Sequence, residues 1–381
     1  MNRALRLLAG TLVLALPLGA AAGCGAEKKK TVKQEFSTAQ DHLADSKSAS
    51  FTLRFGDAAG NLAKAMTKDG DVPPAVVQAL LKGSVTYVTD PAGDATLRSV
   101  QSKGASQADV KAAFSKVNLS FRVRDDQDDL AELRVVKGDL FAHINLNEIG
   151  RLAKAGGVDD FDATLDENLG ASDPRMAQAL TDVRAGKWLK LPLSKYLDQL
   201  QGLAEGFPGA SPGASPGYDL SGLGSRALAA VKPYVKVTDA NDSSKDRVLD
   251  VKVQARPALK ALLAVLKTEK GLPFSGMLGD AESEIDKNVK DGVAKGRITL
   301  HESHLTQVSV DLESIRQLSN DPGNDSFAGV QVVVDVDDDA DELQTPSDVS
   351  KVDLAALVEQ LIGGFFGMGM QGSTSPGSFS G

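Results

Sequence analysis

The feature that most constrains the fold is a two-residue alternation of apolar and polar side chains, repeated in short runs along the chain. The alternation is clearest at 51–55, 117–123, 140–146, 249–253 and 330–336. Further runs at 84–89, 131–137, 187–191, 234–239, 297–301 and 305–312 bring the number to about eleven. Successive side chains of a strand point to opposite faces, so these runs predict antiparallel strands with one buried face and one solvent face.

Fewer segments carry the three- and four-residue spacing of an amphipathic helix. Residues 258–267 follow Pro257, carry a leucine stripe and precede Gly271, and residues 352–362 repeat the spacing. Other helices are predicted near 75–82, 106–114, 147–154, 174–184 and 194–203. Because each apolar stripe needs a partner, we expect an α+β fold in which helices cover one face of a single antiparallel sheet.

Two segments are too rich in Gly, Ser and Pro to predict packed structure. Residues 206–225 contain the tandem GASPGASPG, and residues 363–381 end the chain. The first is interpreted as a long loop within one domain, 45–362, since the same kinds of element flank it. A linker between two domains is the alternative. The second is expected to be a disordered tail, unless its Phe365, Phe366, Met368 and Met370 dock into an apolar groove.

The amino-terminal 23 residues predict export. Arg3 and Arg6 precede the apolar run LLAGTLVLALPL, and the small residues GAAAG follow it. The run is too short to remain as a membrane-spanning helix. Cys24, the only cysteine, comes next, so the chain has no intramolecular disulfide. Residues 24–44 are interpreted as an anchor and a flexible tether, in which Lys28–Lys30 contact anionic headgroups or are simply solvated.

Neither the net charge of the chain nor its acidic clusters indicates a nucleic-acid-binding or metal-binding function. A formal net charge of −9 disfavours nucleic acid, whose binders gather Lys and Arg on one face. Asp335, Asp337, Asp339 and Asp341 have the spacing of a calcium loop. However, Ala340 and Pro346 stand where that loop requires Gly and Glu. The aspartates are therefore interpreted as the solvent side of a strand.

The histidines and the lack of catalytic motifs do not indicate an enzyme. His301 and His304 flank a predicted two-residue turn, but a zinc site needs further ligands, and a polar hairpin end is the preferred interpretation. His42 and His143 have no motif that links them to this pair. Motifs for nucleophilic, phosphate-binding and dinucleotide-binding sites do not occur in the sequence. We therefore predict no catalytic residues, no metal and no cofactor.

Residues around Cys24 and in the body resemble known families. AAGC at 21–24 resembles the bacterial lipoprotein signal, although an aliphatic residue is more usual than Ala21. The resemblance implies cleavage before Cys24, a diacylglyceryl thioether on its sulfur and an acyl chain such as palmitate on its amine. Two or more chains make a durable membrane anchor. An ordinary secretory signal followed by a spare thiol is the alternative.

The segments GKWLKLPLSKYLDQL and GRITLHESHLTQVSVDLESI, with the strand and helix order around them, resemble the actinobacterial LolA-like, LppX–LprG-type envelope lipoproteins. The resemblance implies a half-barrel of about eleven strands with helices over an apolar cavity on its concave face. It also implies a lipid-anchored extracytoplasmic protein of the cell membrane that binds or carries a lipid. The alternative is a non-enzymatic envelope scaffold or sensor that binds another protein. No ligand-binding residue is assigned by a motif.

Overall fold

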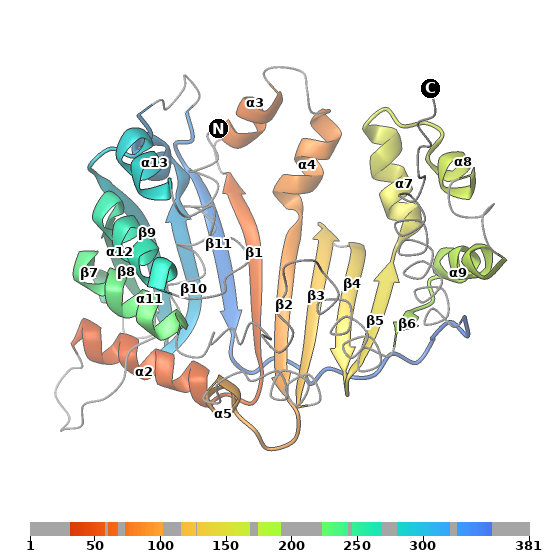
Figure 1. Ribbon diagram of the computed structural model, residues 1–381, viewed down its shortest axis with the longest axis horizontal. Helices are drawn as coiled ribbons and strands as arrows, with labels where there is room; N and C mark the ends of the chain where they lie inside the picture. Colours follow the sequence, from red (N-terminus) through yellow and green to blue (C-terminus); the bar gives the residue numbers. More distant parts are fainter. Residues whose placement is uncertain are drawn as a thin grey trace, which may run out of the picture.

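The computed structural model describes residues 31–57, 60–67, 73–101, 116–126, 128–167, 174–191, 223–242, 246–268, 280–320 and 326–352. Its centre is one sheet of eleven strands (Figure 1). The strands are β1 (Ala49–Asp57), β2 (Ser84–Pro91), β3 (Val117–Asp125), β4 (Asp128–Val136), β5 (Asp139–Ile144), β6 (Leu189–Leu191), β7 (Val235–Asp242), β8 (Asp246–Gln254), β9 (Val293–His301), β10 (His304–Asp311) and β11 (Val330–Asp337).

Helices surround this sheet. They are α2 (Val32–Asp45), α3 (Asn61–Thr67), α4 (Pro74–Lys82), α5 (Leu97–Gln101), α7 (Leu146–Ala155), α8 (Phe161–Leu165), α9 (Pro174–Arg184), α11 (Leu223–Val231), α12 (Ala255–Thr268), α13 (Ala281–Asn288), α14 (Leu312–Gln317) and the 3-10 helix η2 (Lys232–Tyr234). Figure 1 shows α3, α4 and α7 beyond one end of the strands β1–β5, with α11, α12 and α13 grouped near β7–β10.

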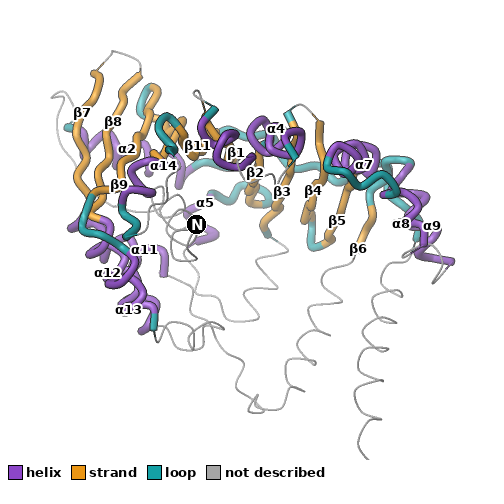
Figure 2. The backbone as a smooth tube through the Cα atoms, turned by 90° about the horizontal axis from the view of Figure 1, so that it is seen from above, coloured by secondary structure: helices purple, strands orange, loops and turns teal. Residues whose placement is uncertain are grey.

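The strand order is β6-β5-β4-β3-β2-β1-β11-β10-β9-β8-β7, and every neighbouring pair is antiparallel. Within the described ranges, the first strand, β1, pairs with the last, β11, at the middle of the sheet, while β6 and β7 form its two edges. Strands on both sides of residues 206–225 therefore join the same sheet. Figure 2 shows that the sheet is open and curved. The predicted α+β class and the eleven predicted strands are confirmed.

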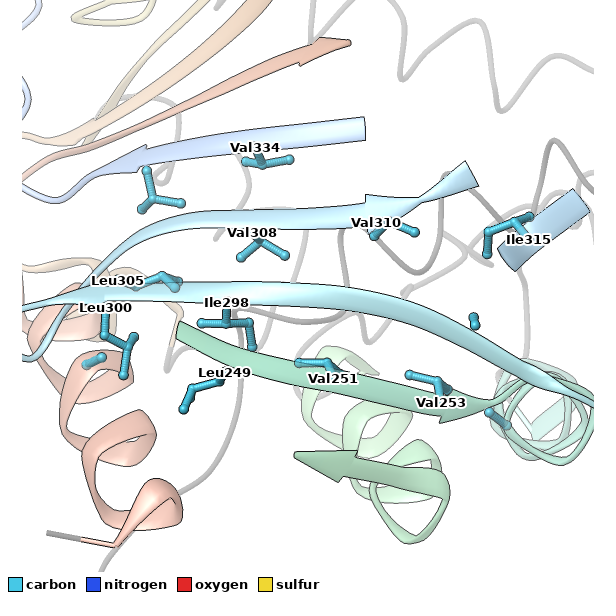
Figure 3. Close-up of a cluster of buried hydrophobic side chains, with 14 of the residues drawn as sticks. Leu249, Val251, Val253, Ile298, Leu300, Leu305, Val308, Val310, Ile315 and Val334 are labelled. Atoms are coloured by element: carbon cyan, nitrogen blue, oxygen red, sulfur yellow. The ribbon is translucent and has the colours of Figure 1, made fainter. Parts of the chain in front are cut away.

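The main core lies on one face of β7–β11 (Figure 3). Leu249, Ile298 and Val308 are cross-strand neighbours there, and each is almost completely buried. Helices α2, α11 and α12 pack over them, with Ala39, Leu43 and Ala258 among the buried residues. Helix α12 corresponds to the helix predicted at 258–267, and its position on this face agrees with the expected helical cover.

Helix α2 corrects the prediction that residues 24–44 form a flexible tether. It begins with a capping box in which Thr31 and Gln34 bind each other's backbone, and Ala39 and Leu43 are buried in the core. The capping box satisfies two backbone donors at the start of the helix, and the apolar stripe holds it on the sheet. Much of the expected tether is therefore a packed part of the fold.

Several predicted segments lie outside the described residues. They are the signal peptide 1–23 with Cys24, the helices at 106–114 and 194–203, the loop 206–225, the helix at 352–362 beyond Val352, and the tail 363–381.

Candidate functional site

The candidate site is the continuation of the apolar core face across β1–β6, which we call the open apolar face. Its side chains form three cross-strand rows because the strands pair in register. The middle row is Phe51, Tyr87, Phe121, Leu133, Ala142 and Leu189. The flanking rows are Leu53, Val85, Val123, Ala131 and Ile144 on one side and Ala49, Thr89, Leu119, Val135, Leu140 and Leu191 on the other. With ordinary strand spacings, the rows cover about 24 Å by about 13 Å.

Large side chains of this face remain exposed, although the same face is buried over β7–β10. The exposed fractions are 37% for Leu53 and Phe55, 40% for Tyr87, 45% for Phe121 and 47% for Leu133. A folded chain normally buries its aromatic and leucine side chains, and a contiguous exposed group of them marks a binding surface more often than a random surface feature. The open apolar face is therefore the strongest candidate for ligand contact among the described residues.

The reverse face of the same strands is polar and partly buried. The Glu132 carboxylate accepts hydrogen bonds from Ser120 Oγ at 2.7 Å and from Arg134 Nη2 at 2.7 Å, and Arg122 Nε lies 3.3 Å from it. Burial alone would raise the pKa of Glu132, but these donors and charges outweigh it and lower the pKa. Asn118 and Ser120, predicted to face solvent, are buried, which corrects the simple two-faced interpretation.

The segment 338–350, which follows β11, helps to cover this polar face. Leu343 packs with Val136 and Phe141, and its backbone N–H donates to Asp90 at 3.0 Å. Farther on, residue 349 forms a parallel bridge with Trp188 next to β6. A covered polar face and a partly open apolar face reverse the arrangement usual for a solvent-facing sheet.

Tyr87 reports on the environment of the open apolar face. Partial burial raises the pKa of its phenol above the ordinary value, while a hydrogen bond with Thr89 acts in the opposite sense. Its ring lies 6.3 Å from that of Phe51. The Tyr87 ring thus lies between Phe51 and Phe121 in the middle row, among apolar side chains that suit contact with an apolar ligand.

His304 contacts two other histidines, His301 across the hairpin and His42 of α2. His301 and His304 are cross-strand partners as predicted, but each imidazole Nδ1 lies 2.7 Å from a different carboxylate, that of Asp246 for His301 and that of Asp338 for His304. His42 of α2 has its ring centroid 4.6 Å from that of His304, a contact that no sequence motif indicated. Within the described ranges, no group of three or more His, Cys, Asp or Glu side chains is arranged to hold a metal ion.

The acidic run at the end of β11 has structural partners. The Asp335 carboxylate accepts hydrogen bonds from Arg54 Nε at 2.6 Å and from Gln307 Nε2 at 2.8 Å. Asp338 is the partner of His304, so these carboxylates are bound to neighbouring strands and turns rather than to a shared centre. In the part of the chain that the structure describes, no helix is both long enough and apolar enough to cross a membrane. Cys24, the predicted lipidation site, lies outside that part.

No family model matches this chain, and no curated protein matches it by sequence. Among solved structures, it is similar to the lipoprotein LppX of Mycobacterium tuberculosis, at 8% sequence identity and a TM-score of 0.28. The match covers 82% of this chain and 96% of LppX. At these values the likeness carries no argument about function, which rests on the open apolar face and on the sequence around Cys24.

Proposed function

We propose that this protein is an extracytoplasmic lipoprotein, held at the cell membrane through Cys24, that binds or carries a hydrophobic ligand on its open apolar face. One observation carries the proposal: Phe121, Leu133 and their neighbours stay exposed while polar residues on the reverse face are buried. Ligand binding surfaces are largely apolar and concave, and each methylene buried there contributes about 0.8 kcal/mol. An acyl chain is the ligand class that such a surface suits best.

The sequence supports the location of this activity. Export by residues 1–23 and acylation of Cys24 would hold the body next to a supply of lipid. The role proposed is binding rather than catalysis, and no catalytic residue is assigned.

The test compares two surface variants. Replacing Phe121 and Leu133 by Gln together is expected to weaken binding of a fluorescent fatty acid by at least about tenfold, because acyl methylenes lose apolar partners. The free energy of unfolding should change by less than about 1 kcal/mol, since both side chains are exposed. The matched control is Val293→Gln, an exposed apolar side chain (39%) on the opposite face of the sheet. It should leave binding unchanged.

Two results would contradict the proposal. One is a wild-type protein that neither carries co-purified lipid, by mass spectrometry of an organic extract, nor binds the probe. The other is equal binding by the double variant and the control. A protein partner captured by the wild-type chain and lost in the double variant, with no lipid bound, would instead favour the envelope scaffold.

A further inference from the structure

Three lysines form one cross-strand row at the β7 edge of the sheet. Lys236 of β7 pairs with Lys252 of β8, and Lys252 pairs with Lys295 of β9. Their neighbours Val251, Val253 and Ala294 are buried in the main core, so the lysine side chains point to the opposite face of the sheet. All three lysines are exposed. We call this set the lysine row.

The lysine row is electrostatically unfavourable in isolation. Side chains directly opposite in an antiparallel pair have Cβ atoms about 5 Å apart, and like charges at that distance destabilise the sheet. Two residues along the same strands, Asp250 and Arg297 are opposite each other and form an ion pair at 3.1 Å. No comparable bond or ion pair holds the three ammonium groups within the described ranges.

No carboxylate within the described ranges forms an ion pair with the lysine row. Asp311, next to Lys295 at the end of β10, keeps its negative charge but accepts the Glu313 N–H at 3.1 Å, where it caps α14. The chain as a whole is acidic, with a formal net charge of −9, so three adjacent lysines are not a result of a basic composition. Val293, two residues before Lys295, adds an exposed apolar side chain to the same face.

We infer that the lysine row contacts the anionic phospholipid headgroups of the membrane that anchors the protein. This inference rests on the anchor in the proposed function. Each Lys near an anionic bilayer contributes about 1 kcal/mol, so three together favour one orientation of the body by roughly a hundredfold. All three side chains are exposed and lie side by side on neighbouring strands, which suits an extended charged surface better than an enclosed phosphate site.

The chain length permits this contact. Glu35 at the start of α2 forms an ion pair with Arg247 of β8, and Lys252 lies five residues farther along that strand, about 17 Å away. The residues from Cys24 to Thr31 span up to about 26 Å when extended. Helix α2 and Arg247 lie on the core face, so this segment has to pass around the β7 edge to reach the opposite face, and its extended length exceeds the distance along the strand. Because that row and the open apolar face are on opposite faces of the sheet, membrane contact leaves the ligand face free.

The test is lysine footprinting of the acylated full chain in vesicles. The protein is inserted into phosphatidylcholine vesicles with or without about 30% phosphatidylglycerol, acetylated briefly, and analysed by mass spectrometry. Lys236, Lys252 and Lys295 should react about three- to tenfold more slowly in the anionic vesicles, and 0.5 M NaCl should remove the difference. Exposed Lys154 serves as the control and should react equally in both.

Equal reactivity of the lysine row in both vesicle types would overturn the inference, and so would equal protection of Lys154. Protection by inorganic phosphate alone, in neutral vesicles, would identify a site for free anions and also contradict membrane contact. These results leave the ligand proposal standing, because they are read from normally inserted protein. Failure of the chain to insert into either vesicle would contradict the anchor, and with it both proposals.

Discussion

At the scale of single residues, Glu132 is the centre of the polar network on the reverse face. It is buried with Ser120 and lies between Arg122 and Arg134. Replacing Glu132 by Gln removes the charge while keeping the shape, and leaves two arginines without their shared counter-ion. We expect the free energy of unfolding in urea to fall by about 2 kcal/mol.

The control for this prediction is Glu282→Gln. Glu282 pairs with Lys267 at 3.3 Å, but its side chain is 58% exposed, and such surface pairs contribute less than about 1 kcal/mol. Equal losses for the two variants would show that the network around Glu132 is no stronger than a surface ion pair.

The lowered pKa of Glu313 predicts how the stability of the protein depends on pH. Arg316 donates to its carboxylate at 2.6 and 3.0 Å, and these bonds, with the Phe327 N–H at 2.8 Å and Gln317, lower its pKa to about 2 against the effect of burial. A carboxylate with a lowered folded-state pKa stabilises the protein above its ordinary pKa, near 4.5. That stabilisation is lost as the pH falls toward 2.

Between pH 5 and pH 2.5, wild-type stability should therefore decrease more than that of Glu313→Gln, by about 2 kcal/mol. The measurement is the urea midpoint of both proteins across this range. Since other carboxylates titrate in both, only the difference between the two profiles counts. Parallel profiles would mean that Glu313 is not specially stabilised in the folded state.

At the scale of elements, the β9–β10 turn has an unusual sequence for its geometry. Both central residues, Glu302 and Ser303, have positive φ angles, 49° and 68°. The β4–β5 turn has the same character, but there Gly138 occupies the second position with φ 83°. Non-glycine residues are disfavoured in this region, and two-residue hairpin turns prefer Asn-Gly.

Replacing Glu302 by Asn and Ser303 by Gly is expected to raise the free energy of unfolding by about 1 kcal/mol, after allowing for the greater freedom of Gly in the unfolded chain. Gly138→Ala should do the reverse, because the left-handed backbone resists a side chain even though the space around it is open. Thermal unfolding measures both. A lowered midpoint for the first variant would show that the native turn residues make compensating contacts.

Predictability at this scale follows from the range of the interactions. Each strand was predictable because period-two alternation is a local signal, as at Leu249, Val251 and Val253. Helix α2 was not predicted because its sequence is polar and follows the signal, as a tether would. Thr31 and Gln34, which form its capping box, were the local signal that could have indicated it. The contact of His42 with His304 was not predictable, since it depends on how α2 lies on the sheet.

At the scale of the whole molecule, alternation defines two faces but does not determine which one is covered. The exposure of Phe121 and the burial of Ser120 depend on where distant segments pack, above all 338–350 over the polar face and α12 over the far end of the apolar one. The site residues share one sequence signal, the placement of Phe51, Phe55, Tyr87 and Phe121 on a common face in a chain with only 5% aromatics. That signal becomes visible only when the strand register is known.

In the proposed function, attachment to the membrane depends on one atom, the sulfur of Cys24. A thioether to diacylglycerol needs that sulfur, so Cys24→Ser should release the protein from the membrane fraction or leave its signal uncleaved. The neighbouring Gly25→Ser serves as the control and should stay membrane-bound. Because Cys24 is the only cysteine, acylated protein should also show no free thiol after denaturation. Normal processing and membrane retention of Cys24→Ser, or one titratable thiol per mature chain, would mean that another part of the chain holds the body at the membrane. The orientation inferred from the lysine row would then lose the tether length on which it depends.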